Sequence, residues 1–300
     1  MLLSIESSKM TRSIRKGETR TVKHVKIAGG LGFIGFHLAR KLLDEGCFVT
    51  AVDSLEKRSE LKLTLEMELG RNAHFTFLQT QIEQADFGDA DVVVFAANNE
   101  NRDALEAVLR QCQSDCLFVF LSTTDVYENS GEWRIQPVTE YGEVMLAQEE
   151  KIRAACTKTG FAAVIIRLPT VYGLHQPYDL KFGRQFVSYE DGTGKTESMH
   201  DLLYIDDVTN ALAAAMAIDS GHHTIHLGSG TFNPFDQTGD SNGLDYQKAH
   251  ELLGFFPRTS LAEGIKKYQL ANEKWQRQKK LTAMYDETKS MAAKHPNTNH

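Results

Sequence analysis

Residues 25–35 of the chain read VKIAGGLGFIG, and this stretch decides the fold. It begins with a short, largely apolar run typical of a buried strand, and helical periodicity follows from Gly35 to Glu45. The glycines between them permit a tight turn, a close approach of the backbone to a pyrophosphate, and close packing of the helix on the strand. The start of a helix also favours an anionic ligand. The stretch therefore predicts a turn that binds the phosphates of a dinucleotide.

An acidic residue follows at the distance that such a turn requires. Phe48 to Val52 form a second predicted strand, and Asp53 ends it, 18 residues after Gly35. A carboxylate there accepts hydrogen bonds from the adenosine ribose hydroxyls and repels a 2′-phosphate, which favours NAD over NADP. In the alternative interpretation the glycines only form a turn and Asp53 lies in a surface loop. The order of strand, glycines and acid favours the cofactor site.

Strands and helical stretches continue to alternate along the chain. Further strands are expected at Phe75–Leu78, Val92–Ala96, Leu117–Leu121 and Ala162–Arg167, and further helices at Leu61–Leu69, Arg102–Cys112 and Tyr141–Ala155. Parallel strands covered on both faces have this apolar character. We therefore predict an α/β fold, a Rossmann-type doubly wound parallel sheet with a small, shortened C-terminal lobe.

Composition narrows the class of protein. The formal net charge of −7 argues against a broad cationic surface for nucleic acid. No apolar run approaches the roughly 20 residues of a membrane span. The four cysteines are too few and too scattered for a disulfide framework, so a reducing, cytoplasmic location is expected. His222, His223 and His226 have no cysteine or carboxylate to complete a ligand set, so no metal site is predicted.

These patterns divide the chain into four parts. Residues 1–24 are polar and basic without apolar periodicity and are expected to be a flexible extension. Residues 25–170 form the predicted NAD-binding Rossmann domain. Residues 171–270 form a small substrate-binding lobe, some of whose strands return to the core. Residues 271–300 are a polar tail, in which residues 273–277 are able to prolong a helix.

Later segments carry a resemblance to a known family, in the family's own order. They are FLSTTDVY at Phe120–Tyr127, the helix before Glu149, RLPTVYG at Arg167–Gly173, HDLLYIDDV at His200–Val208 and LLGFFP at Leu252–Pro257. With the GxxGxxG turn, they resemble the extended short-chain dehydrogenases/reductases, the NAD-dependent epimerase/dehydratase family of nucleotide-sugar enzymes. The match spans about residues 25–265.

The resemblance implies a hydride shuttle with NAD. By position, Tyr141 would be the base that takes the substrate hydroxyl's proton, and Thr123 would orient the substrate oxygen. The family's lysine four residues after the tyrosine is Met145 here. Methionine supplies no charge, so the tyrosine hydroxyl is expected to keep a pKa near about 10 unless another cation intrudes. Conventional Tyr-x-x-x-Lys catalysis is therefore not expected.

Other positions complete the expected site. Gln81 replaces the acid that usually bonds adenine, His200 replaces an arginine that clamps phosphates, and Thr170 replaces an asparagine. Ser122 and Tyr127 are expected either near the cofactor or satisfying backbone groups. The cofactor-binding residues are expected to be Gly29, Gly32, Phe33, Ile34, Gly35, Asp53, Gln81, Ile82, Ala96, Ala97 and Tyr141, and the substrate-binding residues Thr123, Thr124, Asp125, Thr170 and His200.

Two functions of different classes remain open. The first is an enzyme of the epimerase/dehydratase type that acts on a nucleotide-sugar-like substrate by transient hydride transfer. The alternative is a catalytically degenerate Rossmann protein with a regulatory or protein-binding role. The resemblance also implies a homodimer, formed through a four-helix bundle of Arg102–Cys112 and Tyr141–Ala155 from each subunit. Val144, Ile152 and Ala155 have spacing compatible with that interface, or with packing on the sheet.

Overall fold

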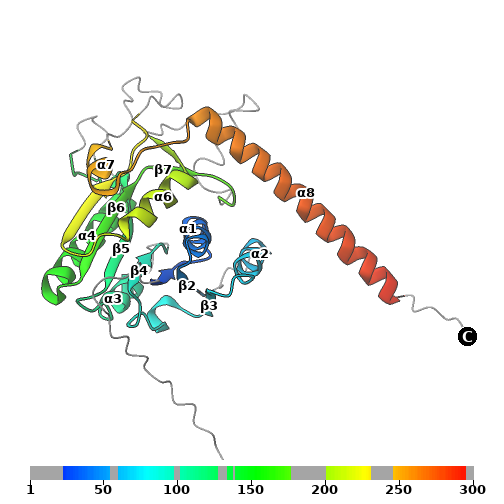
Figure 1. Ribbon diagram of the computed structural model, residues 1–300, viewed down its shortest axis with the longest axis horizontal. Coiled ribbons are helices and arrows are strands. Elements are labelled where there is room, and N and C mark those ends of the chain that lie inside the picture. The colour runs from blue at the N-terminus through cyan, green and yellow to red at the C-terminus, as the bar shows by residue number, and fades with distance from the viewer. Residues whose placement is uncertain are drawn as a thin grey trace, which may run out of the picture.

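A computed structural model describes most of the chain (Figure 1). The described residues are 23–54, 60–97, 102–127, 134–137, 139–176, 201–230 and 246–294. His200, expected to bind substrate, lies outside them. None of the helices in this part of the chain combines the length and the apolar character that a membrane span requires.

A seven-stranded parallel sheet forms the centre of the molecule and confirms the predicted Rossmann-type architecture. The strand order is β3-β2-β1-β4-β5-β6-β9, and each neighbouring pair is parallel. The order reverses between β1 and β4, which is where open sheets of this type bind ligands. The strands are β1 His24–Ala28, β2 Phe48–Asp53, β3 Phe75–Gln79, β4 Val92–Phe95, β5 Leu117–Thr123, β6 Ala162–Leu168 and β9 His222–His226.

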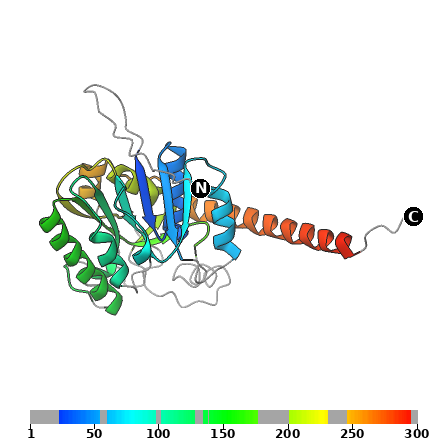
Figure 2. The same cartoon turned by 90° about the horizontal axis from the view of Figure 1, so that it is seen from below.

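Helices cover both faces of this sheet, as the apolar runs of its central strands require (Figure 2). One apolar cluster joins the sheet to α1 Phe33–Asp44, α2 Glu60–Leu69, α6 Ile205–Ala215 and α7 Gln247–Leu253. A second cluster joins the opposite face to α3 Arg102–Leu109 and α4 Glu140–Thr159. Two short 3₁₀ helices, η1 Ile82–Gln84 and η2 Thr124–Val126, follow the ends of β3 and β5.

The C-terminal part adds a small parallel ribbon and a long helix. The ribbon pairs β7 Thr170–Tyr172 with β8 Leu202–Tyr204. Helix α8 runs from Leu261 to Lys294 and extends away from the sheet in both views (Figures 1 and 2). Its first turn is anchored where Gly264 packs on the Tyr172 hydroxyl, so closely that a side chain at Gly264 would clash. The predicted tail is therefore helical through residue 294.

One predicted helix ends earlier than its apolar pattern indicates. The pattern predicted a helix to Cys112, but α3 ends at Leu109 and the chain continues in turns. The Gln111 side chain accepts a hydrogen bond from the Phe87 amide at 2.8 Å and donates one to the Ala85 carbonyl at 3.1 Å. These bonds hold the end of α3, while Cys112 stays buried beyond it. Burial continues past the end of the helix, so apolar periodicity does not reveal that end.

Candidate functional site

The glycine turn lies at the carboxyl end of β1, where the sequence predicted it. Gly29 adopts a φ of +79°, and its amide donates to the Val52 carbonyl at 2.9 Å. A side chain at Gly29 would lie 2.7 Å from the Ala97 backbone, and one at Gly35 would strike the Gly29 carbonyl. At Gly32, in contrast, an added Cβ would meet only the Gly29 carbonyl, at 3.1 Å. Packing within the chain explains Gly29 and Gly35, while Gly32 borders open space.

The same turn begins α1, and no side chain caps the first backbone amides of this helix. Gly32 is the N-cap residue of α1, and it has no side chain to bond the first amides of the helix. Phe33 and Ile34 form the first helical positions. The free N–H groups and the positive end of the helix dipole in such a turn attract an anion. The geometry therefore fits a pyrophosphate above Gly32.

Asp53 ends β2 beside this turn, and its carboxylate forms an ion pair. The residue is 7% exposed, and the Lys62 ammonium donates to its Oδ1 atom at 2.7 Å. Lys62 lies in the first turns of α2 with a side-chain exposure of 27%. Sequence analysis placed Asp53 correctly but missed this cation. The Lys62 ammonium lies next to the carboxylate that was expected to bind the ribose hydroxyls.

The remaining expected cofactor residues line the same edge of the sheet. Gln81 immediately precedes η1, after β3, and Ile82 packs partly on the apolar cluster below. Ala96 follows β4 and its amide donates to the Ala28 carbonyl at 2.9 Å, while Ala97 closes against Gly29. All four positions follow the carboxyl ends of β3 and β4, which lie on either side of the β2–β1 pair in the sheet. The structure thus brings the expected adenosine and pyrophosphate residues to one edge.

Thr123, Thr124 and Asp125 of the expected substrate residues lie at the end of β5, beside the start of α4. The Thr123 hydroxyl accepts a hydrogen bond from the Asp125 amide at 3.1 Å and caps η2, which begins with Thr124. Gly142 packs on the Asp125 backbone so closely that a side chain there would clash. This contact places Tyr141, which is 48% exposed, near Asp125. Thr170 lies in β7, which pairs with β8 in the short parallel ribbon.

Tyr141 is not prepared to act as a base at neutral pH. Burial raises the pKa of its hydroxyl, and the negative charge of Asp125 raises it further. Met145, one helical turn later, is 1% exposed and belongs to the apolar cluster that also contains Val126 and Phe120. Lys151 is occupied by an ion pair with Glu106 of α3. Among the residues that the structure describes, no cation lies beside the Tyr141 hydroxyl to stabilise a phenolate.

Arg167 of β6 is a buried cation in this region, and its guanidinium bonds other side chains. The Arg167 guanidinium donates to the Glu149 carboxylate at 2.9 and 2.7 Å and to the Tyr127 hydroxyl at 2.9 Å. Ser122 donates to the same carboxylate at 2.6 Å, and the Tyr127 hydroxyl bonds the His226 ring at 3.1 Å. The hydroxyls of Ser122 and Tyr127 thus bond buried side chains at the end of β5.

This network is buried and ionised. Burial opposes ionisation of Glu149, but the hydrogen bonds from Arg167 and Ser122 and the nearby cations outweigh it, so the pKa of Glu149 lies below its usual value. Its side chain is fully buried and that of Arg167 is 4% exposed. The network joins β5, β6, β9 and α4 directly below the expected substrate residues. We interpret it as the support that fixes them.

Comparisons with known proteins agree with this geometry. The model of the NAD dependent epimerase/dehydratase family matches residues 25–228. An uncharacterized UDP-glucose epimerase of Bacillus subtilis, YtcB, is 26% identical over 302 residues, covering 80% of this chain and 95% of the relative. The dTDP-6-deoxy-L-talose 4-dehydrogenase (NAD(P)(+)) of Kitasatospora kifunensis is 23% identical over 299 residues, covering 81% and 93%. The UDP-glucuronic acid 4-epimerase of Bacillus cereus, solved with NAD, has a TM-score of 0.71 at 23% identity, covering 84% and 99%.

Proposed function

The chain belongs to the NAD dependent epimerase/dehydratase family, and we propose that it binds NAD along the carboxyl edge of its sheet and acts on a nucleotide sugar by transient hydride transfer. The observation that carries the proposal is the glycine turn beside the buried carboxylate of Asp53. The relatives are named for UDP-linked and dTDP-linked sugars, which supports that substrate class.

The residues of the turn fit the cofactor. Gly32 leaves space where a side chain would block a pyrophosphate, and Asp53 offers a carboxylate to the ribose hydroxyls. Gln81 would bond the adenine, and Ala96 and Ala97 would flank the cofactor. NAD, when bound, supplies the acceptor for the substrate's hydride. The chain itself supplies binding, orientation and proton transfer.

On the substrate side, we assign Thr123, Thr124 and Asp125 to contacts with the sugar, together with Thr170 and His200 of the C-terminal lobe. Because its pKa is raised, Tyr141 is protonated at neutral pH and donates a hydrogen bond to the substrate oxygen. It accepts a proton only in alkaline solution. Proton removal from a sugar hydroxyl is therefore slow at neutral pH.

The alternative function also has a specific observation in its favour. Met145 is buried where a catalytic lysine is expected, and no described cation replaces it beside Tyr141. A chain that binds NAD without turnover would act through a partner or as a regulator. Binding and turnover must therefore be tested separately.

Calorimetric titration with NAD and NADP tests the cofactor site. We expect NAD to bind, and Asp53→Ala to abolish binding because the ribose hydroxyls lose their acceptor. The matched control is Asp44→Ala, which removes an exposed carboxylate from the far end of α1. NAD affinity should survive that change. Failure of NAD and NADP to bind the unaltered chain would contradict the proposal.

Turnover is tested with UDP-linked and dTDP-linked hexoses in the presence of NAD. Epimerised, dehydrated or oxidised product favours the enzyme, whereas firm NAD binding without any product favours the alternative. Tyr141→Phe should abolish product formation and leave NAD affinity within a few fold. If product formation is unaffected by Tyr141→Phe, our assignment of this tyrosine is wrong.

A further inference from the structure

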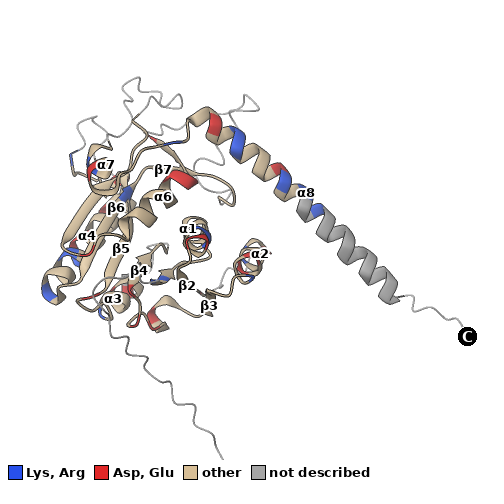
Figure 3. Ribbon diagram, in the orientation of Figure 1, with Lys and Arg blue, Asp and Glu red and all other residues tan. Residues whose placement is uncertain are grey.

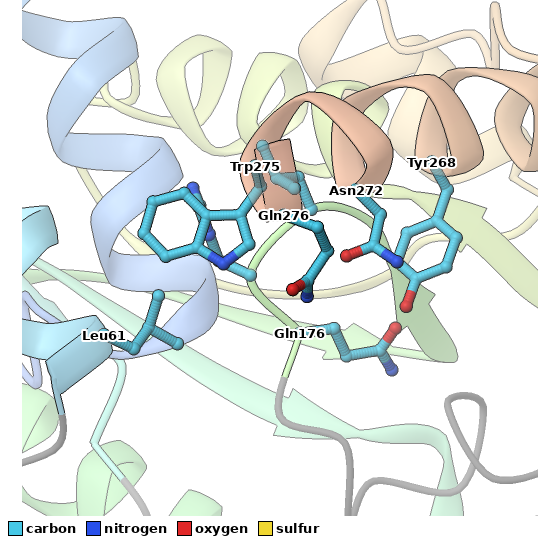
Figure 4. Close-up of a pocket in the computed structure, with 8 residues that line it drawn as sticks. Leu61, Gln176, Tyr268, Asn272, Trp275 and Gln276 are labelled. Atoms are coloured by element: carbon cyan, nitrogen blue, oxygen red, sulfur yellow. The ribbon is translucent and has the colours of Figure 1, made fainter. Parts of the chain in front are cut away.

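A pocket lies beneath the first turns of α8, apart from the glycine turn (Figure 4). It has a volume of about 250 Å³ and is lined by Leu61 of α2, by the segment 174–176 after β7, and by α8. In Figure 4, Trp275 and Leu61 lie at one end and Tyr268 at the other, with amide side chains between them. None of the residues assigned to cofactor or substrate lines it.

The α8 face that lines this pocket is unusually polar for a packing face. Tyr268, Asn272, Trp275 and Gln276 recur at the spacing that places side chains on one side of a helix. Packing against the body of the protein alone would favour aliphatic residues at these positions. Two amides and two aromatic rings with polar atoms supply hydrogen bonds as well as apolar surface.

Gln176 provides an acceptor that no described residue of the chain uses. Its Nε2 atom donates to the Val171 carbonyl at 3.1 Å, which fixes the orientation of the amide. Its Oε1 atom is removed from solvent and has no hydrogen-bond partner within the described part of the chain. Figure 4 shows this oxygen directed toward the α8 side of the pocket. A buried acceptor without a donor is destabilising, and a ligand with an N–H donor would recover that loss.

The neighbouring His175 is held in a strained conformation. Its φ of +66° is the only positive value of a non-glycine residue in the described part of the chain. The ring of Trp275 lies 4.8 Å from that of His175 in an edge-to-face arrangement, and His37 donates to the Leu174 carbonyl at 2.7 Å. Strain of this kind collects at ligand sites, where the surroundings enforce it.

The pocket is also uncharged. Burial, followed by the charges of the nearby His37 and Arg40, lowers the pKa of His175 to about 4, so this ring is neutral at physiological pH. The other described lining residues are amides, aromatic residues and leucines. A pocket of this size is smaller than the roughly 300–1,000 Å³ that hold whole drug-sized ligands. It suits one neutral ring system, and its described lining residues offer no charged partner for a phosphate.

We propose that this pocket binds a nucleobase, with the ring against Trp275 and a ring N–H donated to Gln176 Oε1. Bases are neutral, flat and edged with donors and acceptors, and proteins recognise them by aromatic stacking combined with amide hydrogen bonds. The ligand would be a free nucleoside or the base of a nucleotide whose phosphates remain in solvent. This site is distinct from the cofactor site at the glycine turn.

Tryptophan fluorescence tests the proposal directly, because the chain has only two tryptophans, Trp133 and Trp275. In a Trp133→Phe chain, all tryptophan emission comes from the pocket. We expect uridine or adenosine to quench it with a Kd on the order of 0.1–1 mM. Gln176→Leu should weaken this binding about tenfold, since the acceptor is lost, and Gln113→Leu, an exposed change on the opposite face, should not.

The same titration separates this site from the cofactor site. With Asp53→Ala the nucleoside should still quench Trp275, even though NAD binding is lost. Three outcomes would overturn the proposal: no quenching by either nucleoside, equal affinities of the Gln176→Leu and Gln113→Leu chains, or loss of quenching with Asp53→Ala. Quenching by glucose with none by nucleosides would also overturn it, because the pocket would then recognise a sugar.

Discussion

Met145 is the residue on which the chemistry of Tyr141 depends. A lysine one turn away would favour the phenolate, so Met145→Lys should lower the pKa of Tyr141. The measurement is a spectrophotometric titration, taken as the difference between each chain and its Tyr141→Phe counterpart. The unaltered chain should show this tyrosine titrating above its ordinary pKa, since burial and Asp125 both oppose ionisation. Met145→Leu is the apolar control and should change nothing. A Tyr141 that titrates near neutral pH in the unaltered chain would contradict the structure.

We expect Lys62 to influence how strongly the proposed cofactor site discriminates between NAD and NADP. Its ammonium bonds the Asp53 carboxylate at 2.7 Å and partly offsets the repulsion between that carboxylate and a 2′-phosphate. Lys62→Met should therefore weaken NADP relative to NAD by roughly tenfold. The ratio of the two dissociation constants is the measurement, because loss of the ion pair affects both cofactors. Lys41→Met is a matched control, since Lys41 is equally exposed and pairs with Glu45 at 2.9 Å. An unchanged ratio would show that Lys62 has no such role.

The packing of β5, β6 and α4 against one another depends on the buried ion pair of Glu149 and Arg167. Glu149→Gln leaves the Arg167 charge buried without its counter-ion and should lower the free energy of unfolding by about 3–5 kcal/mol. Urea denaturation measures this. Glu143→Gln, on the exposed side of the same helix, should have little effect. The double change Glu149→Leu and Arg167→Met should recover part of the loss, because both charges are then removed. Additive losses in the double variant would contradict this account.

The same pair gives stability a defined pH dependence. The pKa of Glu149 is lower in the folded state than in the unfolded state, so the folded state binds its proton more weakly. The stabilisation is complete above the unfolded pKa of about 4.3 and disappears as pH falls through the lower folded value. The difference in unfolding free energy between the unaltered chain and Glu149→Gln should therefore be constant at neutral pH and shrink below about pH 4. A difference that grows on acidification would be inconsistent with the pair.

Across the whole molecule, the features that sequence analysis recovered are local in the chain. The glycine turn, the carboxylate of Asp53 at a strand end and the periodicity of α4 each follow from neighbouring residues. The Arg167 network was missed because it joins segments far apart in the sequence. Its signal was nevertheless present, since a charged residue inside an apolar strand must be paired. The pocket under α8 had no comparable signal, because its lining residues are adjacent only after folding.

The outer face of α4 bears on whether the chain forms a dimer. For Ile152, the spacing allowed either a dimer interface or packing on the sheet, and its side chain is fully buried in the apolar cluster between the sheet, α3 and α4. The outer face of α4 instead presents Ala147 and Ala154, small enough for another helix to approach.

We therefore expect a dimer through the α4 face, with sedimentation velocity as the measurement. Ala147→Glu should give monomers, because a two-fold axis brings the new charge close to its own copy. Along α8, charges of both signs are mixed (Figure 3), and Leu270, 58% exposed, is the competing apolar contact. If Leu270→Glu gives monomers and Ala147→Glu does not, the subunits meet through α8. An unaltered chain that is monomeric at every concentration would exclude both interfaces.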